Sequence, residues 1–279
     1  MHRRPIQSLR EYLLDRMVLR PSRHPIEHAP LTRVMLESSG RPLECFKQKN
    51  FEGDQPPELL LLKFPGTAGR AERSTEFPLS ILDNVHGTMW TWNPPGYGRS
   101  GGRASLSGIA DAAIDFWNQV LQREAGPSTS VWLCGNSLGC ATTLHVASAV
   151  QPDPSKSGIV LRNPPPLGPV VKRVAQRYPL ASLVSPIAES VCDSMNVLLS
   201  AREVHLPAVF FQSELDTLVP VAFQNQVVEA YAGESRVVLM EGLSHGGVAT
   251  EFHKPMIEES IRWLWEQTGC KTDEPYSAS

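Results

Sequence analysis

A chain of 279 residues is long enough to bury a large apolar core without disulfide bonds. Apolar residues make up 41% of it and charged residues 20%, which is typical of a soluble globular protein and not of a disordered or fibrous chain. The formal net charge of −3 gives no indication of a nucleic-acid or polyanionic partner.

The first 30 residues are expected to precede the main domain. Residues 1–20 carry five arginines and apolar residues at helical spacing, which predicts an amphipathic helix that packs on the domain or makes weak contact with a membrane surface. The apolar positions are Ile6, Leu9, Leu13 and Met17. The segment lacks the continuous apolar stretch of a signal peptide, and no segment approaches the length of a transmembrane helix. The proline-rich residues 21–30 are expected to form an extended linker.

Short apolar runs bounded by glycine, proline or polar residues predict eight strands. The first two, Leu31–Glu37 and Pro42–Lys47, are separated by turn residues and should form a β-hairpin. The other six are runs of the kind expected for strands that are buried on both faces. They are Leu59–Leu62, Thr88–Trp92, Ser130–Cys134, Ile159–Leu161, Ala208–Phe211 and Val237–Met240.

Helical patterns lie between several of these strands. Apolar residues recur at i, i+3, i+4 and i+7 between Leu106 and Leu121, and Leu138–Val150 is almost wholly apolar. Two further helices are expected at Val221–Tyr231 and Met256–Trp265. Such alternation of strands and helices predicts an α/β fold with a mostly parallel sheet that is flanked by helices.

The connection between the strands at Ile159–Leu161 and Ala208–Phe211 is longer than a crossover helix requires. It contains three helix-like segments, Val170–Tyr178, Leu180–Val191 and Met195–Ala201. We interpret them as a helical cap inserted over the carboxyl edge of the sheet. The expected organisation is an N-terminal helix and linker in residues 1–30 and one domain in residues 31–279, with the cap inserted at about 166–206.

The segment Gly135–Gly139 matches Gly-x-Ser-x-Gly and stands between a predicted strand and a predicted helix. A sharp strand–turn–helix connection strains the backbone of its central residue, Ser137, and the flanking glycines leave room for neighbouring backbone. The Ser137 hydroxyl would then stand clear of the sheet at a helix N-terminus, which favours negative charge. The alternative is a glycine-flanked turn in which Ser137 only caps the helix.

In these residues, and in the order of elements after about Leu31, the chain resembles the α/β-hydrolase superfamily. The resemblance implies an acid after a later strand and a histidine after the last one. Asp216, in an Asp-x-x-Val-Pro sequence, fits the acid, with Glu214 as its rival and a turn or helix-capping role as the alternative. His245, in a glycine-rich loop, fits the base. A serine hydroxyl needs such a base to become a nucleophile, and a carboxylate holds the required imidazole tautomer.

The resemblance also implies an oxyanion hole made by the backbone N–H groups of Leu138 and Thr67. Thr67 lies in a Gly-rich loop where Pro65 replaces the histidine of many relatives, which leaves the Thr67 N–H in place. An ordinary turn is the alternative. The segment Asn93–Ser100 resembles a family loop near the pocket mouth and lacks the residues of a phosphate-binding loop.

A serine at the nucleophile position, where dehalogenases and epoxide hydrolases of this fold have aspartate, implies acyl transfer. We therefore expect a serine hydrolase that cleaves a carboxylic ester in a small-molecule substrate. The alternatives are an amidase or peptidase, a thioesterase, a carbon–carbon bond hydrolase and a non-catalytic binding protein. No C-x-x-C pair is present and no two histidines have metal-ligand spacing in a credible context, so we expect no metal and no cofactor. Five scattered cysteines favour a reducing, cytoplasmic location.

Overall fold

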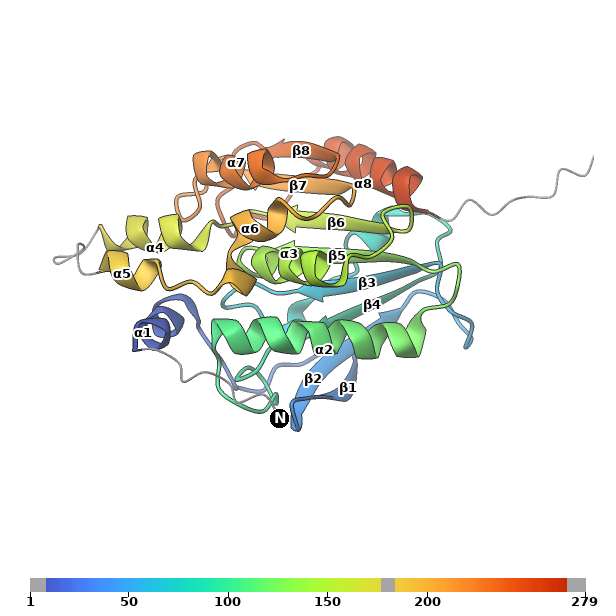
Figure 1. Ribbon diagram of the computed structural model, residues 1–279. Coiled ribbons are helices and arrows are strands. Elements are labelled where there is room, and N and C mark those ends of the chain that lie inside the picture. The colour runs from blue at the N-terminus through green and yellow to red at the C-terminus, as the bar shows by residue number, and fades with distance from the viewer. Residues whose placement is uncertain (1–8, 177–183, 270–279) are drawn as a thin grey trace, which may run out of the picture.

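The computed structural model describes residues 9–176 and 184–269, and the strands in this part of the chain form one eight-stranded sheet (Figure 1). In spatial order the sheet reads β1-β2-β4-β3-β5-β6-β7-β8. The strands are β1 (Thr32–Ser38), β2 (Arg41–Lys49), β3 (Leu59–Phe64), β4 (Gly87–Trp92), β5 (Ser130–Asn136), β6 (Ser157–Arg162), β7 (Ala208–Ser213) and β8 (Ser235–Met240). The β1–β2 and β2–β4 pairs are antiparallel and the others are parallel, so the predicted sheet is confirmed.

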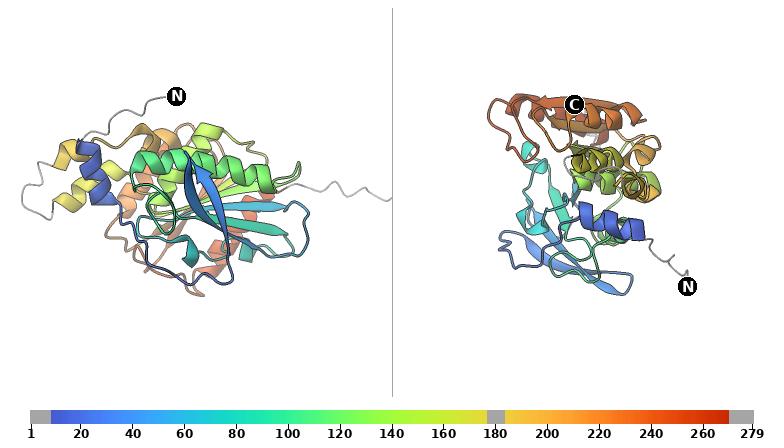
Figure 2. Two further views of the ribbon diagram at one scale, coloured as in Figure 1. Left: turned by 90° about the horizontal axis from the view of Figure 1, so that it is seen from below. Right: turned by 90° about the vertical axis from the view of Figure 1, so that its left-hand side faces the viewer.

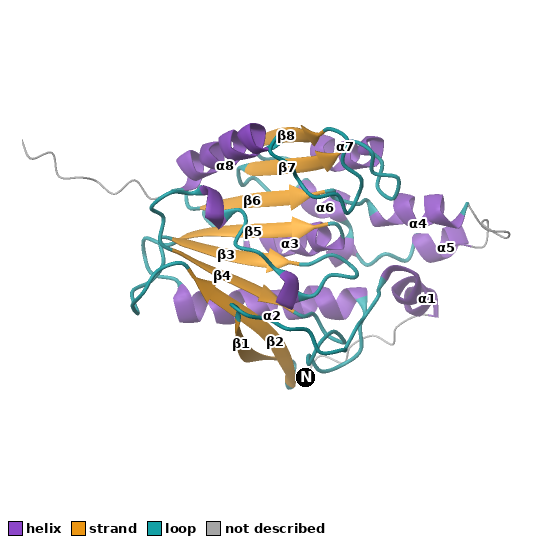
Figure 3. Cartoon of the chain, turned by 180° about the vertical axis from the view of Figure 1, so that it is seen from behind, coloured by secondary structure: helices purple, strands orange, loops and turns teal. Residues whose placement is uncertain are grey.

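Helices cover both faces of this sheet, as the sequence predicts (Figure 3). One face packs against α2 (Leu106–Glu124), α3 (Leu138–Val150), α6 (Val197–Ala201) and α7 (Val221–Ala230). The other face packs against α8 (Lys254–Thr268) and the 3₁₀ turns η1 (Ala71–Arg73) and η2 (Leu79–Ile81). Each face therefore has its own apolar core.

The buried strands explain why the apolar runs in the sequence are continuous. In β3, Leu60 and Leu62 contribute to the core beneath α2 and α3, whereas Leu59 and Leu61 contribute to the core beneath α8. All four side chains are fully buried, because successive residues of a strand point to opposite faces of a covered sheet. By the same alternation, Lys63 follows Leu59 and Leu61 on the α8 face.

The N-terminal helix α1 (Leu9–Val18) packs on the domain. Leu14 and Asp15 are buried, and Asp15 Oδ1 accepts a hydrogen bond from the Leu106 N–H at the start of α2, at 2.9 Å. Leu9 and Leu13 remain exposed. Asp15 therefore links α1 to the first turn of a core helix. Across residues 9–176 and 184–269, none of the helices has both the length and the apolar character to cross a membrane.

The long connection from β6 to β7 is helical, in the range where an insertion was expected. It contains α4 (Leu167–Ala175), α5 (Ser185–Ala188), η4 (Asp193–Met195) and α6. Helices α4 and α5 lie beyond the carboxyl ends of the strands with α1 beside α5, whereas α6 packs against α3 and α7 (Figure 2). The helix expected over residues 180–191 falls partly outside the described residues, and within them only Ser185–Ala188 is helical.

Candidate functional site

Ser137 occupies a sharp turn between β5 and α3. Its backbone has φ +54° and ψ −122°, a combination that a residue with a side chain adopts only when the surroundings enforce it. The Ser137 N–H donates to the Arg162 carbonyl at the end of β6, and the Ser137 carbonyl accepts from the Cys140 N–H, both at 2.8 Å. These two bonds hold the strained residue between the sheet and the first turn of α3. The strand–turn–helix geometry predicted for Gly135–Gly139 is therefore present.

The glycine two residues after Ser137 is required by close packing. A Cβ at Gly139 would collide with the Phe64 carbonyl oxygen and would lie 2.9 Å from the Pro65 carbonyl oxygen. Both atoms are backbone atoms at the end of β3, so they cannot rotate away. The first turn of α3 therefore lies directly against the loop that follows β3, which is the loop expected to carry Thr67.

Replacing Gly139 by alanine is expected to lower the free energy of unfolding by about 2 to 3 kcal/mol, because the new methyl group overpacks a site walled by backbone. Gly246 is the matched control, since a Cβ there would have no atom within 4 Å. Urea denaturation followed by circular dichroism compares the two variants. Equal stability of Gly139→Ala and the wild type would contradict the close approach.

His245 and Asp216 complete a chain of hydrogen bonds that starts at Ser137. His245 lies in the loop after β8, and its Nε2 is 3.1 Å from Ser137 Oγ. Its Nδ1 is 2.6 Å from Asp216 Oδ2. Since an ionised carboxylate only accepts, Nδ1 donates to Asp216, and Nε2 is left to accept the serine hydroxyl proton. The structure thus brings together the three side chains that the sequence singles out.

The Asp216 carboxylate is fixed by the turn that carries it. Its other oxygen, Oδ1, accepts from the N–H groups of Leu218 at 2.9 Å and Val219 at 2.8 Å. The side chain is fully buried, whereas the side chain of His245 is 27% exposed. The sequence left two roles open for Asp216, stabilising a turn and bonding to the histidine. In the structure its carboxylate does both. Glu214 instead accepts from the Gly242 N–H and has no bond to His245.

Two residues at the end of β6 position the His245 loop and were missed in the sequence. Asn163, fully buried with φ +52°, donates from Nδ2 to Ser213 Oγ at 3.1 Å and to the His245 carbonyl at 3.2 Å. The Arg162 guanidinium donates to the Gly247 carbonyl. An asparagine at a strand end, where a left-handed backbone is common for this residue type, is the one signal that could have indicated this role.

The two backbone N–H groups expected to form an oxyanion hole belong to segments that touch each other. A Cβ at Gly66 would lie 3.1 Å from the Asn136 carbonyl oxygen and 3.3 Å from Ser137 Cβ, so the loop before Thr67 touches the turn that carries the serine. Within the described part of the chain, no hydrogen bond engages the backbone N–H of Leu138 or Thr67. Neither N–H group therefore has a hydrogen-bond acceptor among the described residues.

Tyr97 fixes the position of Thr67 and was likewise missed in the sequence. This side chain is 1% exposed, and its hydroxyl donates to the Thr67 carbonyl at 2.8 Å while accepting from the Arg20 N–H at 3.2 Å. The Thr67 hydroxyl in turn donates to the Val18 carbonyl. The last residue of α1 and the Asn93–Ser100 loop thus hold Thr67 from two sides.

Replacing Tyr97 by phenylalanine is expected to lower kcat of the activity proposed below about tenfold, because a loosened Thr67 donor stabilises an oxyanion less well. The lost hydrogen bond should also lower the free energy of unfolding by about 1 kcal/mol. Tyr231→Phe is the matched control, since its buried hydroxyl donates to the Leu206 carbonyl elsewhere. Equal losses of kcat in both variants would show that Tyr97 supports stability alone.

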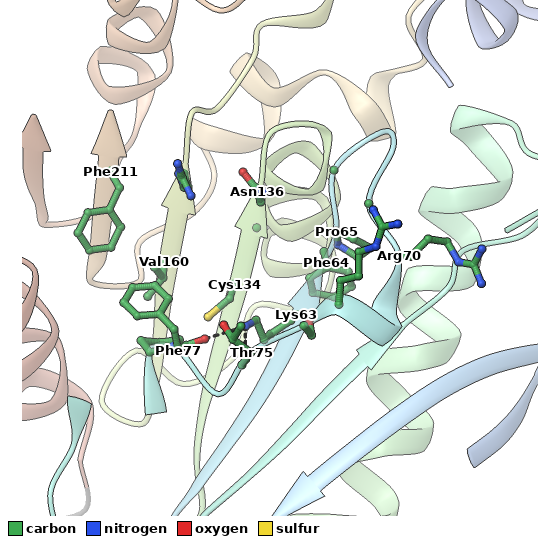
Figure 4. A pocket seen from close by; sticks show the side chains of 17 residues that line it. Lys63, Phe64, Pro65, Arg70, Thr75, Phe77, Cys134, Asn136, Val160 and Phe211 are labelled. Atoms are coloured by element: carbon green, nitrogen blue, oxygen red, sulfur yellow. Dashed lines mark hydrogen bonds between the residues drawn. The ribbon is translucent and has the colours of Figure 1, made fainter. Parts of the chain in front are cut away.

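A cavity of about 380 Å³ lies at the carboxyl ends of β3, β5, β6 and β7, next to the turn that carries Ser137, although Ser137 and His245 are not among the residues that line it (Figure 4). Gly66, Gly135 and Asn136 contribute to its wall. Phe77 and Phe211 form an apolar side, with ring centroids 6.0 Å apart. Among the described residues, no group of three or more His, Cys, Asp or Glu side chains is arranged to hold a metal ion.

The sheet order and the strand–turn–helix at Ser137 define the α/β-hydrolase fold, and solved structures agree. Est1E from Butyrivibrio proteoclasticus with bound ferulic acid is 13% identical, with a TM-score of 0.63 over 84% of this chain and 98% of that one. The Pyrococcus furiosus esterase PF2001 is 15% identical, with a TM-score of 0.63 over 90% and 98%. An acetyl xylan esterase from Paenibacillus sp. R4 is 14% identical, with a TM-score of 0.61 over 92% and 99%.

At the level of sequence, the chain is similar to an uncharacterized protein of Mycobacterium tuberculosis. The two are 28% identical over 262 residues, which cover 90% of this chain and 87% of the mycobacterial one. No protein-family model matches the chain. The function of this protein is therefore inferred from its fold and from the geometry of the site.

Proposed function

We propose that this protein is a serine hydrolase that cleaves a carboxylic ester through an acyl-enzyme, with Ser137 as nucleophile, His245 as general base and acid, and Asp216 as the residue that orients His245. The observation that carries the proposal is the continuous hydrogen-bond chain from Ser137 Oγ through both ring nitrogens of His245 to Asp216. A serine that only capped α3 would not need this contact, and Ser137 makes no side-chain cap bond.

The proposed mechanism follows from the donors and acceptors at the site. Ser137 Oγ attacks the ester carbonyl carbon while its proton moves to His245 Nε2. The carbonyl oxygen becomes an oxyanion that accepts from the N–H groups of Leu138 and Thr67. Nε2 then gives its proton to the departing alcohol oxygen, which leaves an acyl-Ser137. Water, deprotonated by Nε2, attacks the acyl group, and Ser137 regains its proton as the acid departs.

An ester is favoured over an amide because an alcohol is the better leaving group, and solved structures with this fold include an esterase and an acetyl xylan esterase. In this proposal, α4 and α5 act as a cap, because they lie beyond the carboxyl ends of the strands that carry the site. The connection from β6 to β7 would then limit the size of substrates.

The test is turnover of p-nitrophenyl esters from acetate to palmitate by the purified full-length protein at pH near 8, together with labelling by a fluorophosphonate and identification of the labelled residue. Turnover with the label on Ser137 would support the proposal, and the chain-length profile would define the acyl preference. Labelling without ester turnover would favour an amide, thioester or carbon–carbon bond substrate. No turnover and no label would favour a binding protein.

A further inference from the structure

The cavity beside Ser137 has an unusual charge distribution. Four basic residues line it, and no aspartate or glutamate does so among the described residues. They are Lys63, Arg70, Arg73 and Arg162. Arg70 is already neutralised, because its guanidinium is paired with the buried carboxylate of Glu72. The other three form no ion pair with any carboxylate in the described part of the chain.

Of these three cations, Lys63 is the most buried and is held in place by two backbone carbonyls. Its ammonium group donates to the Thr75 carbonyl at 2.6 Å and the Phe77 carbonyl at 2.7 Å, which leaves one of its three N–H groups for a ligand (Figure 4). It lies at the carboxyl end of β3, where the preceding residues on the same face are core leucines. Burial lowers the pKa of Lys63 to about 8, so the group is still mostly protonated at pH 7.

The two arginines place further positive charge around the same space. The Arg162 guanidinium donates to the Gly247 carbonyl and is partly buried. The Asp216 carboxylate attracts the Arg162 guanidinium, but both Asp216 oxygens already accept hydrogen bonds, one from His245 and the other from two backbone N–H groups. Arg73 is exposed and has no side-chain partner in the described residues. Since a partly desolvated cation without an ion pair is unfavourable, a bound anion would stabilise Lys63 and Arg162, and the exposed Arg73 adds a third positive charge at the same cavity.

We propose that the substrate carries an anionic group, a carboxylate or a phosphate, that binds in this cavity against Lys63, Arg73 and Arg162 while the ester carbonyl lies at Ser137; this inference rests on the function proposed above. The apolar side at Phe77 and Phe211 fits the hydrocarbon that separates the anion from the ester. The substrate class is therefore an acidic ester, for example a half-ester of a dicarboxylic acid.

The test compares esters that differ in one charge. Mono-p-nitrophenyl adipate and p-nitrophenyl hexanoate have acyl chains of equal carbon number, and only the first ends in a carboxylate. A second pair, 4-acetoxybenzoate and its methyl ester, places the carboxylate on the leaving group. A third, 4-acetoxyphenyl phosphate and phenyl acetate, replaces the carboxylate by a phosphate. The wild type is expected to have kcat/KM at least about tenfold higher for the charged member of one pair, as a charge-assisted hydrogen bond predicts.

Variants connect this preference to the cavity. Lys63→Gln and Arg73→Gln are each expected to reduce the ratio of kcat/KM for the charged and neutral esters about five- to tenfold. Arg202→Gln is the matched control, because Arg202 is exposed at the end of α6 and does not line the cavity. A wild-type ratio near one in all three pairs, or equal ratios in the wild type and both cavity variants, would overturn the proposal.

A binding experiment separates this proposal from the proposed function. If no ester is turned over and no fluorophosphonate reacts, the hydrolase assignment fails, and calorimetric titration with monomethyl adipate still tests the cavity. Binding that is weakened by Lys63→Gln and Arg73→Gln but not by Arg202→Gln would support an anion site. Absence of binding in that titration would overturn it.

Discussion

Alanine at position 137 is expected to lower kcat for the proposed ester hydrolysis by at least about 10³-fold, because the proposed acyl-enzyme route requires the Ser137 hydroxyl. The fold should be unaffected, since the Ser137 side chain caps no helix and its strained backbone is held by main-chain bonds to Arg162 and Cys140. The measurement is kcat on the best p-nitrophenyl ester, with circular dichroism to verify folding.

Two further variants sharpen this experiment. Ser148→Ala, on the same helix, removes a hydroxyl that donates only to the His145 carbonyl and should leave kcat unchanged. The double variant Ser137→Ala/His245→Ala should lose no more activity than Ser137→Ala alone, because nucleophile and base act as a unit. Additive losses would mean that the two residues act independently. Full activity of Ser137→Ala would overturn the nucleophile assignment.

The sequence predicted the sheet and the three hydrogen-bonded residues for the same reason: their signals are local. Continuous apolar runs mark strands buried on both faces, and the run Leu59–Leu62 forms the first four residues of β3, all of which are buried. Ser137, Asp216 and His245 each follow a predicted strand, and the carboxyl ends of parallel strands meet at one edge of the sheet. Short motifs after strands could therefore be placed together without a structure.

The supporting residues could not be found in this way, because their roles depend on contacts between distant segments. Asn163 bonds to Ser213 and to the His245 carbonyl, which are 50 and 82 residues away in the chain. Tyr97 contacts Thr67 and Arg20 from the Asn93–Ser100 loop, whose sequence indicated only a structural role near the pocket mouth. The basic cavity could not be predicted from the sequence for the same reason, because Lys63, Arg73 and Arg162 come from three separate elements.

The substitution Asp216→Asn is expected to lower kcat of the proposed activity about 10⁴-fold, and the hydrogen bonds of Asp216 give the physical reason for so large an effect of an isosteric change. The N–H groups of Leu218 and Val219 require an acceptor at the position of Oδ1, so the amide oxygen of the new side chain would occupy that place. The amide NH₂ would then face His245 Nδ1 as a donor. Nδ1 would have to become an acceptor, and Nε2 would carry the ring proton.

In that tautomer Nε2 carries a proton and cannot accept the Ser137 proton. The three side chains would keep their positions, but Nε2 would donate to Ser137 Oγ instead of accepting from it. Glu214→Gln is the matched control, because Glu214 accepts only from the Gly242 N–H and should tolerate the same carboxylate-to-amide change with less than about a threefold loss. A large loss in Glu214→Gln together with an active Asp216→Asn would reassign the acid to Glu214. Nitrogen-15 chemical shifts of His245 add a readout independent of turnover, since the proton should move from Nδ1 to Nε2 in Asp216→Asn and stay on Nδ1 in Glu214→Gln.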